Sequence, residues 1–526
     1  MSKRVRRAAR HRREPGVLDR ILATPQLARV VPQLQPEVLH RVIQHCGLEE
    51  CGELVALATP DQLARVFDLD LWRPAAPGGD DLFDADRFGK WLEVLLDAGV
   101  ASAAAKLAAM DSALVAAALL EHIRVIDPVA ITPYITLEGE QANPGYWLDD
   151  DLCCEVAGYV ISPKRDAFLG SITSVLNALA DAHASYFNRV MRTCCRLSNS
   201  RPEVDGPDDL PTAGEQAMFD LAFDRDARRD PQGYVTPAEA RAFLQTSRHL
   251  DLRQRSVPPR DPLTHAYFRD NAHAEPAAEA PPEAVATLVD LLREAGVVPR
   301  TPRRLLEGAP GSAPRLARVR AHLLFVHDRD PAAYAARNAE LAYLANVIAA
   351  GATIQSRAVV AEEASNAALA VCNLGLESWP VAVSEDHLVD HDLVRVFQVG
   401  WTVLHEDVCM YTAGALVDVL TSSHSADRDV HVALETLRRT LTKYWRAGTP
   451  WHARNALEVI AILDTPAWAA LLGLIDELPT LHAAVDASLT ATTSRIDASA
   501  FEFISERSQI DRVREFMLQL PQRLSS

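Results

Sequence analysis

The stretch TPDQLARVF, residues 59–67, shows how this 526-residue chain is built. A threonine followed by proline, with glutamine at the third position after the threonine, is typical of a helix start. The threonine caps the helix, the proline occupies its first turn, and the glutamine reaches back to the cap. Leu63, Val66 and Phe67 then recur at helical spacing. The stretch therefore predicts a short helix with one apolar face.

The same pattern occurs twice more. QPEVLHRVI begins at Gln35, and a shorter copy, TPQLARVV, begins at Thr24. We expect the proline to open a helix in each copy and Gly47 to end the helix before residue 59, because glycine is favoured just past a helix C-terminus. The helical pattern continues through residues 84–126. Short repeated helices bury their faces by stacking on neighbours, so residues 15–127 are predicted to form an irregular α-superhelix.

Composition favours closely packed helices throughout. Aromatic residues make up only 6% of the chain and alanine is abundant, which suits helices better than β-sandwiches or barrels. The formal net charge of −18 argues against a body that binds nucleic acid. The exception is MSKRVRRAARHRR, residues 1–13, with seven Lys or Arg and no acid. We expect residues 1–14 to be a disordered basic arm, with a weak contact to RNA or another polyanion as the alternative.

The helical pattern is interrupted in two places. ITPYITLE and EVAGYVIS, within residues 131–161, are rich in β-branched and aromatic residues and predict a small β-hairpin. Six prolines in residues 255–283 predict a linker. The fold is therefore predicted to be mainly α, with a superhelix followed by a second helical domain. The remaining segments are a helical region with the hairpin (128–254), a C-terminal helical domain (284–500) and a terminal helix or tail (501–526).

RDPQGYVTPAEARAF, residues 229–243, has the glycine and acids of a calcium loop. Such a loop needs oxygen ligands at its first, third, fifth and twelfth positions, with glycine at the sixth. Placing Gly233 at the sixth position puts Arg228, a cation, where the first ligand must be. Thr236 and Glu239 instead predict a second helix start with a capping box.

One stretch carries a candidate site. In HDLVRVFQVGWTVLHEDVC, residues 391–409, the side chains along one line of an ideal helix are polar and nearly all the others are apolar. A helix that is apolar around most of its circumference is usually buried. We expect the polar line to face an interior cleft or an interface, and the alternative is a set of satisfied polar groups in the core. The candidate ligand-lining residues are His391, Arg395, Gln398, Thr402, His405 and Cys409.

Within that stretch, HEDVC resembles the metal-binding helix of zinc proteases. His405 and Cys409 are one turn apart, as two ligands on a helix would be. Cysteine stands where that motif has histidine, and nothing in the sequence orients a third ligand. No GxSxG, Walker loop or GxGxxG motif is present. We therefore expect no metal and no cofactor.

Cysteine usage and hydropathy predict a cytoplasmic protein without disulfides. The eight cysteines include the adjacent pairs Cys153–Cys154 and Cys194–Cys195 and no CxxC, which favours free thiols in a reducing compartment. The N-terminus lacks the apolar core of a signal peptide. The most apolar long stretch, residues 458–475, is broken by Asp464 and Pro466, so no membrane span is expected.

Several phrases resemble a bacterial family that carries only a domain-of-unknown-function label. They include QGYVTPAEARAFL, NAELAYLANVI and DLVRVFQVGWTVLHEDVCMY, and the similarity covers most of the chain outside the basic arm and the linker. The resemblance implies a large helical cytoplasmic protein with no assigned activity or site. The N-terminal repeats are more weakly similar to the helical superhelices of magnesium-transporter cytoplasmic domains and flagellar motor-switch proteins.

Two functional hypotheses follow. The first is a helical protein-interaction or regulatory protein whose N-terminal superhelix is a docking surface for a protein partner. The second is an enzyme or small-ligand-binding protein that uses the polar line of residues 391–409.

Overall fold

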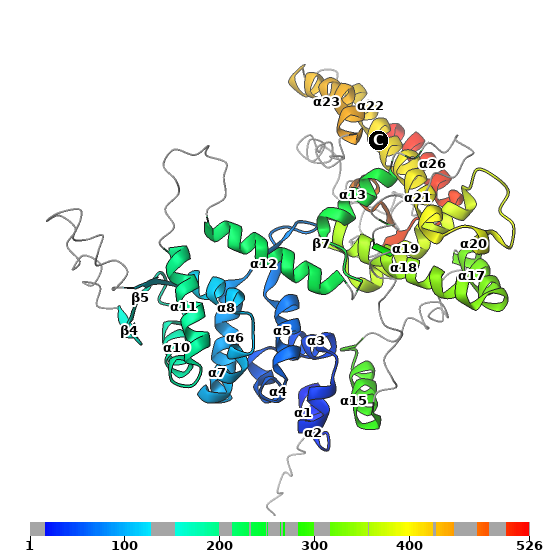
Figure 1. Cartoon of the computed structure of the whole chain (residues 1–526). Helices are drawn as coiled ribbons and strands as arrows, with labels where there is room; N and C mark the ends of the chain where they lie inside the picture. Colours follow the sequence, from blue (N-terminus) through cyan, green and yellow to red (C-terminus); the bar gives the residue numbers. More distant parts are fainter. Residues whose placement is uncertain are drawn as a thin grey trace, which may run out of the picture. The chain divides into compact units, whose positions relative to one another are not determined.

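The computed structural model describes most of the chain. The described residues are 16–127, 153–198, 213–230, 233–248, 250, 264, 267–268, 282–298, 316–355, 357–423, 428–446, 471–482 and 501–524. Within them the fold is mainly α-helical with a few short antiparallel strand pairs, which confirms the predicted fold class (Figure 1). Three predicted features lie wholly or mostly outside the described residues: the basic arm, the ITPYITLE half of the hairpin, and the proline-rich linker.

The chain divides into two compact units, each assembled from separate segments. Unit 1 comprises Met1–Arg73, Asp81–Ala227 and Glu275–Pro302, and unit 2 comprises Pro74–Asp80, Arg228–Ala274 and Arg303–Ser526. The division differs from the predicted boundaries because helix α15 (Glu283–Glu294) belongs to unit 1, where Val285, Leu288 and Leu292 join its core. Composition identifies a proline-rich segment before α15, but it does not show to which unit's core that helix contributes.

Unit 1 is a series of short helices that pack on their neighbours. Contacts join α3 to α5, α4 to α6, and α6 to α7. Its helices are α1 (Val17–Leu22), α2 (Leu27–Val30), α3 (Pro36–Cys46), α4 (Gly52–Leu57), α5 (Pro60–Asp70), α6 (Ala85–Asp97), α7 (Val100–Ala108), α8 (Ser112–Leu120), α10 (Leu169–Ala182), α11 (Ala184–Ser198), α12 (Ala213–Arg229, in unit 1 as far as Ala227) and α15.

Proline opens a helix in two of the three repeated stretches. Pro36 and Pro60 each occupy the first turn, and Gly47, with a φ of 97°, ends α3 as predicted. The expectation for the third copy was wrong. Pro25 lies in a turn, and α2 begins only at Leu27. This helix is four residues long and passes into a 3₁₀ turn, because the next proline cannot donate a backbone hydrogen bond.

Gln62, in the capping box of α5, also makes hydrogen bonds to two backbone carbonyl groups that are distant in the sequence. The Gln62 Oε1 accepts the backbone N–H of Thr59 at 2.9 Å. The Gln62 Nε2 donates to the backbone oxygens of Val31 at 2.8 Å and Leu34 at 2.7 Å. One buried side chain therefore caps its own helix and fixes the turn before α3.

Replacing Gln62 by alanine is expected to lower the free energy of unfolding by about 2–3 kcal/mol, because buried carbonyl and N–H groups lose their partners. The matched control is Glu239→Ala in the exposed capping box of α13 (Pro237–Ser247), where the carboxylate accepts from Thr236. That change should cost only about 0.5–1 kcal/mol. Urea unfolding followed by circular dichroism measures both, and equal losses would contradict the expectation.

A three-stranded sheet in unit 1 corrects part of the prediction for residues 84–126. Strand β5 (Tyr159–Pro163) lies between β3 (Ile123–Ile126) and β4 (Cys154–Val156), and both pairings are antiparallel. Residues 123–126 therefore form a strand, not a helix, with alternating buried and exposed side chains. EVAGYVIS makes a hairpin by itself, because Ala157 and Gly158 both have positive φ, as a two-residue hairpin turn requires. The remaining strands of this region, β1 (Trp72–Pro74) and β2 (Asp81–Phe83), pair with each other.

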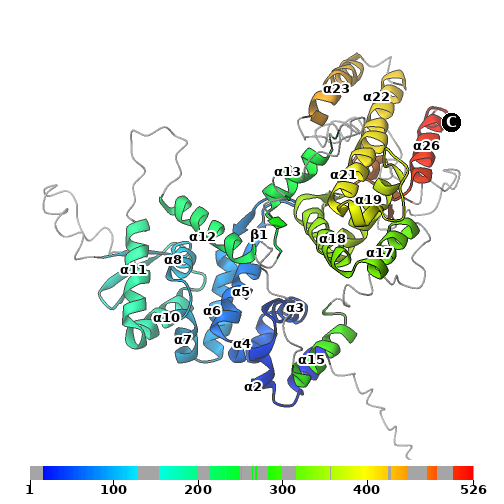
Figure 2. The ribbon, with the colours of Figure 1, turned by 45° about the vertical axis from the view of Figure 1, so that its right-hand side comes forward.

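Unit 2 is built around α18, α19 and α21, which pack on one another (Figure 2). Its helices are α13, α17 (Ala317–Arg329), α18 (Pro331–Gly351), α19 (Ala361–Glu377), α20 (His387–Asp390), α21 (Leu393–Leu404), a π-helix (His405–Met410), α22 (Tyr411–Ser423), α23 (Arg428–Arg446) and α26 (Arg507–Leu524). Two antiparallel strand pairs accompany them: β6 (Thr353–Ile354) with β7 (Arg357–Ala358), and β8 (Thr480–His482) with β9 (Phe501–Phe503).

Helices α19 and α21 approach so closely that their backbones touch. A methyl group placed on Gly375 would lie 2.0 Å from the backbone oxygen of Val396. A methyl group on Gly400 would lie 2.0 Å from the backbone oxygen of Val371. Real Cβ atoms do not approach other atoms this closely, so both positions require glycine.

Two chemical expectations can be compared with the structure. All eight cysteines are free thiols. Among the described residues, no single helix has the length and apolar character to cross a bilayer, and only α7 with α8, a pair bent by 117°, meets those criteria jointly.

Candidate functional site

The predicted polar line does not follow one regular helix. His391 lies in the turn after α20, its ring 4.5 Å from that of His387, and Asp392 caps the start of α21. At His405 the α-helix becomes a π-helix, which has more residues per turn. Cys409 is therefore rotated away from the line that an ideal helix would give it.

The middle of the line is buried and hydrogen-bonded to backbone. Thr402 donates to the carbonyl oxygen of Ser247 at 2.7 Å. The ring of His405 is fully buried, with Nδ1 2.9 Å from the Trp401 oxygen and Nε2 2.9 Å from the Glu477 oxygen. Because both ring nitrogens face carbonyl oxygens, neither is open to a metal ion. These side chains join α21 to α13 and to the segment before β8.

The other predicted residues, Arg395, Gln398 and Cys409, also show no arrangement within the described residues that indicates a ligand site. Arg395 and Gln398 form a hydrogen bond of 3.3 Å on α21. Burial raises the pKa of the Cys409 thiol to about 12, the positive charge of Arg248 opposes the shift, and the negative charge of Asp476 adds to it. Since the thiolate is the nucleophile and the metal ligand, a buried thiol with a raised pKa is a poor candidate for either role. The two surface hollows described below include none of the six residues.

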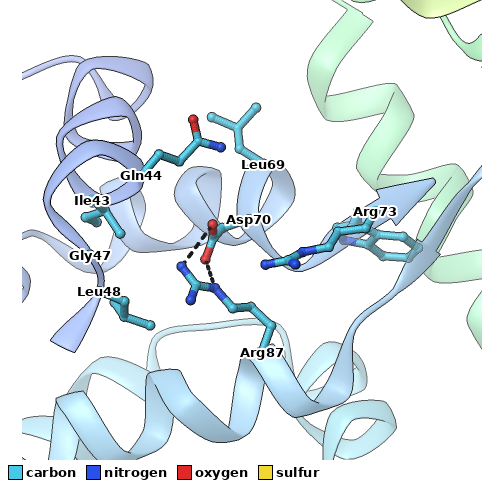
Figure 3. A pocket seen from close by; sticks show the side chains of 9 residues that line it. Ile43, Gln44, Gly47, Leu48, Leu69, Asp70, Arg73 and Arg87 are labelled. Carbon is cyan, nitrogen blue, oxygen red and sulfur yellow. Dashed lines mark hydrogen bonds and ion pairs between the residues drawn. The ribbon is translucent and has the colours of Figure 1, made fainter. Parts of the chain in front are cut away.

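A hollow of about 450 Å³ lies in unit 1, at the junction of α3, α5, β1 and α6 (Figure 3). Sequence reasoning did not identify it. Its lining residues are Ile43, Gln44, Gly47, Leu48, Leu69, Asp70, Trp72, Arg73 and Arg87.

Asp70 is the centre of this hollow and is almost entirely buried. Its carboxylate accepts hydrogen bonds from Arg87 Nε at 2.6 Å and Nη2 at 3.3 Å. It also accepts one from Trp91 Nε1 at 2.7 Å and faces His40 Nε2 at 3.2 Å. Burial alone would raise the pKa of Asp70, but the hydrogen bonds from His40, Arg87 and Trp91 outweigh it and hold the pKa well below its ordinary value. The carboxylate is therefore charged at neutral pH, and its acceptor sites are occupied.

A second surface feature of unit 1 is the outer side of α12. Phe219 is 62% exposed and Phe223, one turn later, is 75% exposed. The inner side of the helix packs Leu221 and Arg225 against unit 1, where Arg225 donates to the Asp81 carboxylate at 2.7 Å. We call the surface formed by Leu82, Met218, Phe219 and Phe223 the α12 face.

A shallower hollow of about 310 Å³ adjoins the α12 face. Leu82 and Met218 contribute to its lining, and so do three acidic residues, Asp84, Asp86 and Glu121. Arg165 makes an ion pair of 3.1 Å with Asp86 at its edge. The sequence did contain a signal for this surface, because AMFDLAFDRD, residues 217–226, places two phenylalanines between acids at helical spacing.

Comparison with known proteins gives a family and no activity. A family model described as "Family of unknown function (DUF6178)" matches residues 4–406. No curated protein and no solved structure matches the chain. The matched range includes the hollow at Asp70 and the α12 face.

Proposed function

Because this chain belongs to the DUF6178 family, whose function is unknown, we propose its role from its own surface: it is a protein-interaction protein that docks a partner on the α12 face. The predicted docking role thus stays with the N-terminal half of the chain. Its expected position changes from the superhelix of residues 15–127 to α12 and β2. The free thiols support a cytoplasmic location as part of the proposal.

The exposed pair Phe219 and Phe223 carries the proposal. Single exposed apolar residues are common on proteins, but two phenylalanines one turn apart on α12 form a larger apolar surface. Leu82, which is 59% exposed, lies with Met218 of the same helix in the lining of the adjoining hollow. Burying one such side chain stabilises a complex by about 1.5–3 kcal/mol. Aromatic residues of this kind are frequent binding hot spots.

Charge around the α12 face indicates the chemistry of the partner. Glu215, Asp220 and Asp224 are exposed on the same helix. The adjoining hollow adds three acids, of which Asp84 and Asp86 form ion pairs with Arg73 and Arg165 of the same lining. A second copy of this chain would bring like charges together, which opposes association. We therefore propose a partner that presents an apolar segment flanked by Lys or Arg. The basic arm, residues 1–13, remains proposed as a separate and weaker contact for polyanions.

The test is partner capture by the full chain with a photo-crosslinking residue at Gln216, which is exposed on α12. The cross-linked peptide should be apolar with flanking basic residues. The double variant Phe219→Ser, Phe223→Ser should reduce capture of that protein by about tenfold or more, since the loss of two buried phenylalanines removes several kcal/mol. Its melting temperature should not change, because both side chains are exposed.

The matched control is Leu324→Ser with Leu518→Ser, two exposed leucines in unit 2. This variant should capture the partner as well as the wild type does. Equal capture by the phenylalanine variant would remove the docking role from the α12 face. Cross-links between two copies of the chain, with a dimer in solution, would show self-association in place of a partner.

A further inference from the structure

The Asp70 hollow offers two guanidinium groups to one small space. Figure 3 shows the side chains of Arg73, from β1, and Arg87, from α6, pointing toward Asp70. We infer that this hollow binds a small oxyanion, a carboxylate or a phosphate, between the guanidinium groups of Arg73 and Arg87. The inference does not rest on partner docking on the α12 face, although Arg73 also lines the hollow beside that face.

Arg87 is held in place before any ligand arrives. Its Nε and Nη2 donate to Asp70, and its backbone N–H donates to the Asp84 carboxylate at 2.8 Å. Its Nη1 makes no hydrogen bond to another residue that the structure describes. A guanidinium fixed by a buried carboxylate retains donors in a set orientation, which is the arrangement that oxyanion recognition requires.

Arg73 cannot be satisfied by Asp70. A carboxylate has about four lone-pair sites, and His40, Arg87 and Trp91 supply four contacts to them. Arg73 is mostly exposed, and its one ion pair joins Nε to the Asp84 carboxylate at 3.4 Å. Its two terminal nitrogens are then available to a ligand. An anion between the two arginines would accept charge-assisted hydrogen bonds from both guanidinium groups.

The walls define the rest of the ligand. Ile43, Leu48, Leu69 and Trp72 contribute apolar atoms to the lining, but its surface is more polar than apolar, and the side-chain amide of Gln44 adds a further polar group. A volume of about 450 Å³ is that of a site for a small organic molecule. Asp70 and Asp84 balance the two arginines in formal charge, so we expect weak binding, with a Kd on the order of 1 mM. The ligand class is a small organic acid or phosphate ester.

The test is titration of the full chain with two probes, inorganic phosphate and succinate, against sodium chloride at matched ionic strength. Binding is followed by ³¹P line width for phosphate and by ¹H saturation transfer for succinate. Arg73→Ala should weaken binding by about tenfold or more, because it removes a charge-assisted hydrogen-bond donor pair. Arg73→Lys should give an intermediate loss, because it keeps the charge and removes the planar fork.

The matched control is Arg65→Ala, an exposed arginine on the outer side of α5, which should bind as the wild type does. Binding of phosphate alone would assign a phosphoryl ligand, and binding of succinate alone a carboxylate. Unchanged binding by Arg73→Ala, or no binding of either probe to the wild type, would overturn the inference. The phenylalanine double variant should bind the probes normally, so this result is separable from partner docking.

Discussion

Gly400→Ala is expected to lower the free energy of unfolding by about 4 kcal/mol or more, a large effect for one added methyl group. The methyl would lie 2.0 Å from the Val371 oxygen and 3.0 Å from its carbonyl carbon, both of them backbone atoms of α19. Backbone cannot turn aside as a side chain can, so α19 and α21 would have to separate. Since their contact is central to unit 2, the loss should spread through its core.

The control for Gly400 is the same substitution at Gly414, in α22, where a methyl group would meet nothing within 4 Å. Alanine favours helix more than glycine does, so Gly414→Ala should raise stability by about 1 kcal/mol or less. Thermal unfolding followed by circular dichroism measures both variants. Similar melting temperatures for the two variants would show that α19 and α21 can move apart at little cost.

Asp70→Ala is expected to cost about 3–5 kcal/mol, because it leaves the donors of Arg87, His40 and Trp91 without their shared acceptor in a buried position. Asp61→Ala removes an exposed carboxylate from the first turn of the same helix and should cost only about 0.3–1 kcal/mol. Urea unfolding of the two variants gives the comparison. Equal losses would mean that the carboxylate of Asp70 contributes no more than an exposed one.

The same carboxylate gives stability a defined dependence on pH. The pKa of Asp70 is lowered in the folded protein, so its contribution is fully present above the unfolded pKa, near 4, and is lost as pH falls below that value. Wild-type stability should therefore decline from about pH 4 downward. The Asp70→Ala variant, already destabilised, should decline less steeply over that range, and parallel curves would contradict the assignment.

Sequence alone predicts those features that depend on interactions between neighbouring residues. The helix starts at Pro36 and Pro60 and the capping box at Thr236 follow from a few adjacent residues, and the structure confirms them. Gly400 shows the limit of such reasoning. Within α21, Gly400 is only a residue of low helix propensity. Its need to be glycine follows from the close contact with Gly375 in α19, and nothing in the sequence indicates that α19 packs against α21.

The polar side chains of residues 391–409 do not lie along one line of a single helix, and local periodicity could not show this. Helical periodicity assumes a constant number of residues per turn, and the π-helix from His405 breaks that assumption. The Asp70 hollow was missed because its polar groups come from separate helices. Each of them, taken alone in the sequence, is an ordinary charged or aromatic residue, and only the tertiary fold makes them a set.

Helix α15 belongs to unit 1 although it follows a segment of unit 2 in the chain, and this order has a consequence for biosynthesis. The apolar residues of α15 belong to a core whose other helices all lie before residue 228, so the part of that core which α15 covers stays open until about residue 302 has been synthesised. At 5–20 residues per second, this takes roughly 15–60 s. During that time the nascent chain also carries α13, whose Phe243 and Leu244 are buried only by helices translated later. Both units therefore expose apolar surface to solvent at the same stage of translation, and this is the stage at which we expect chaperone binding to matter most.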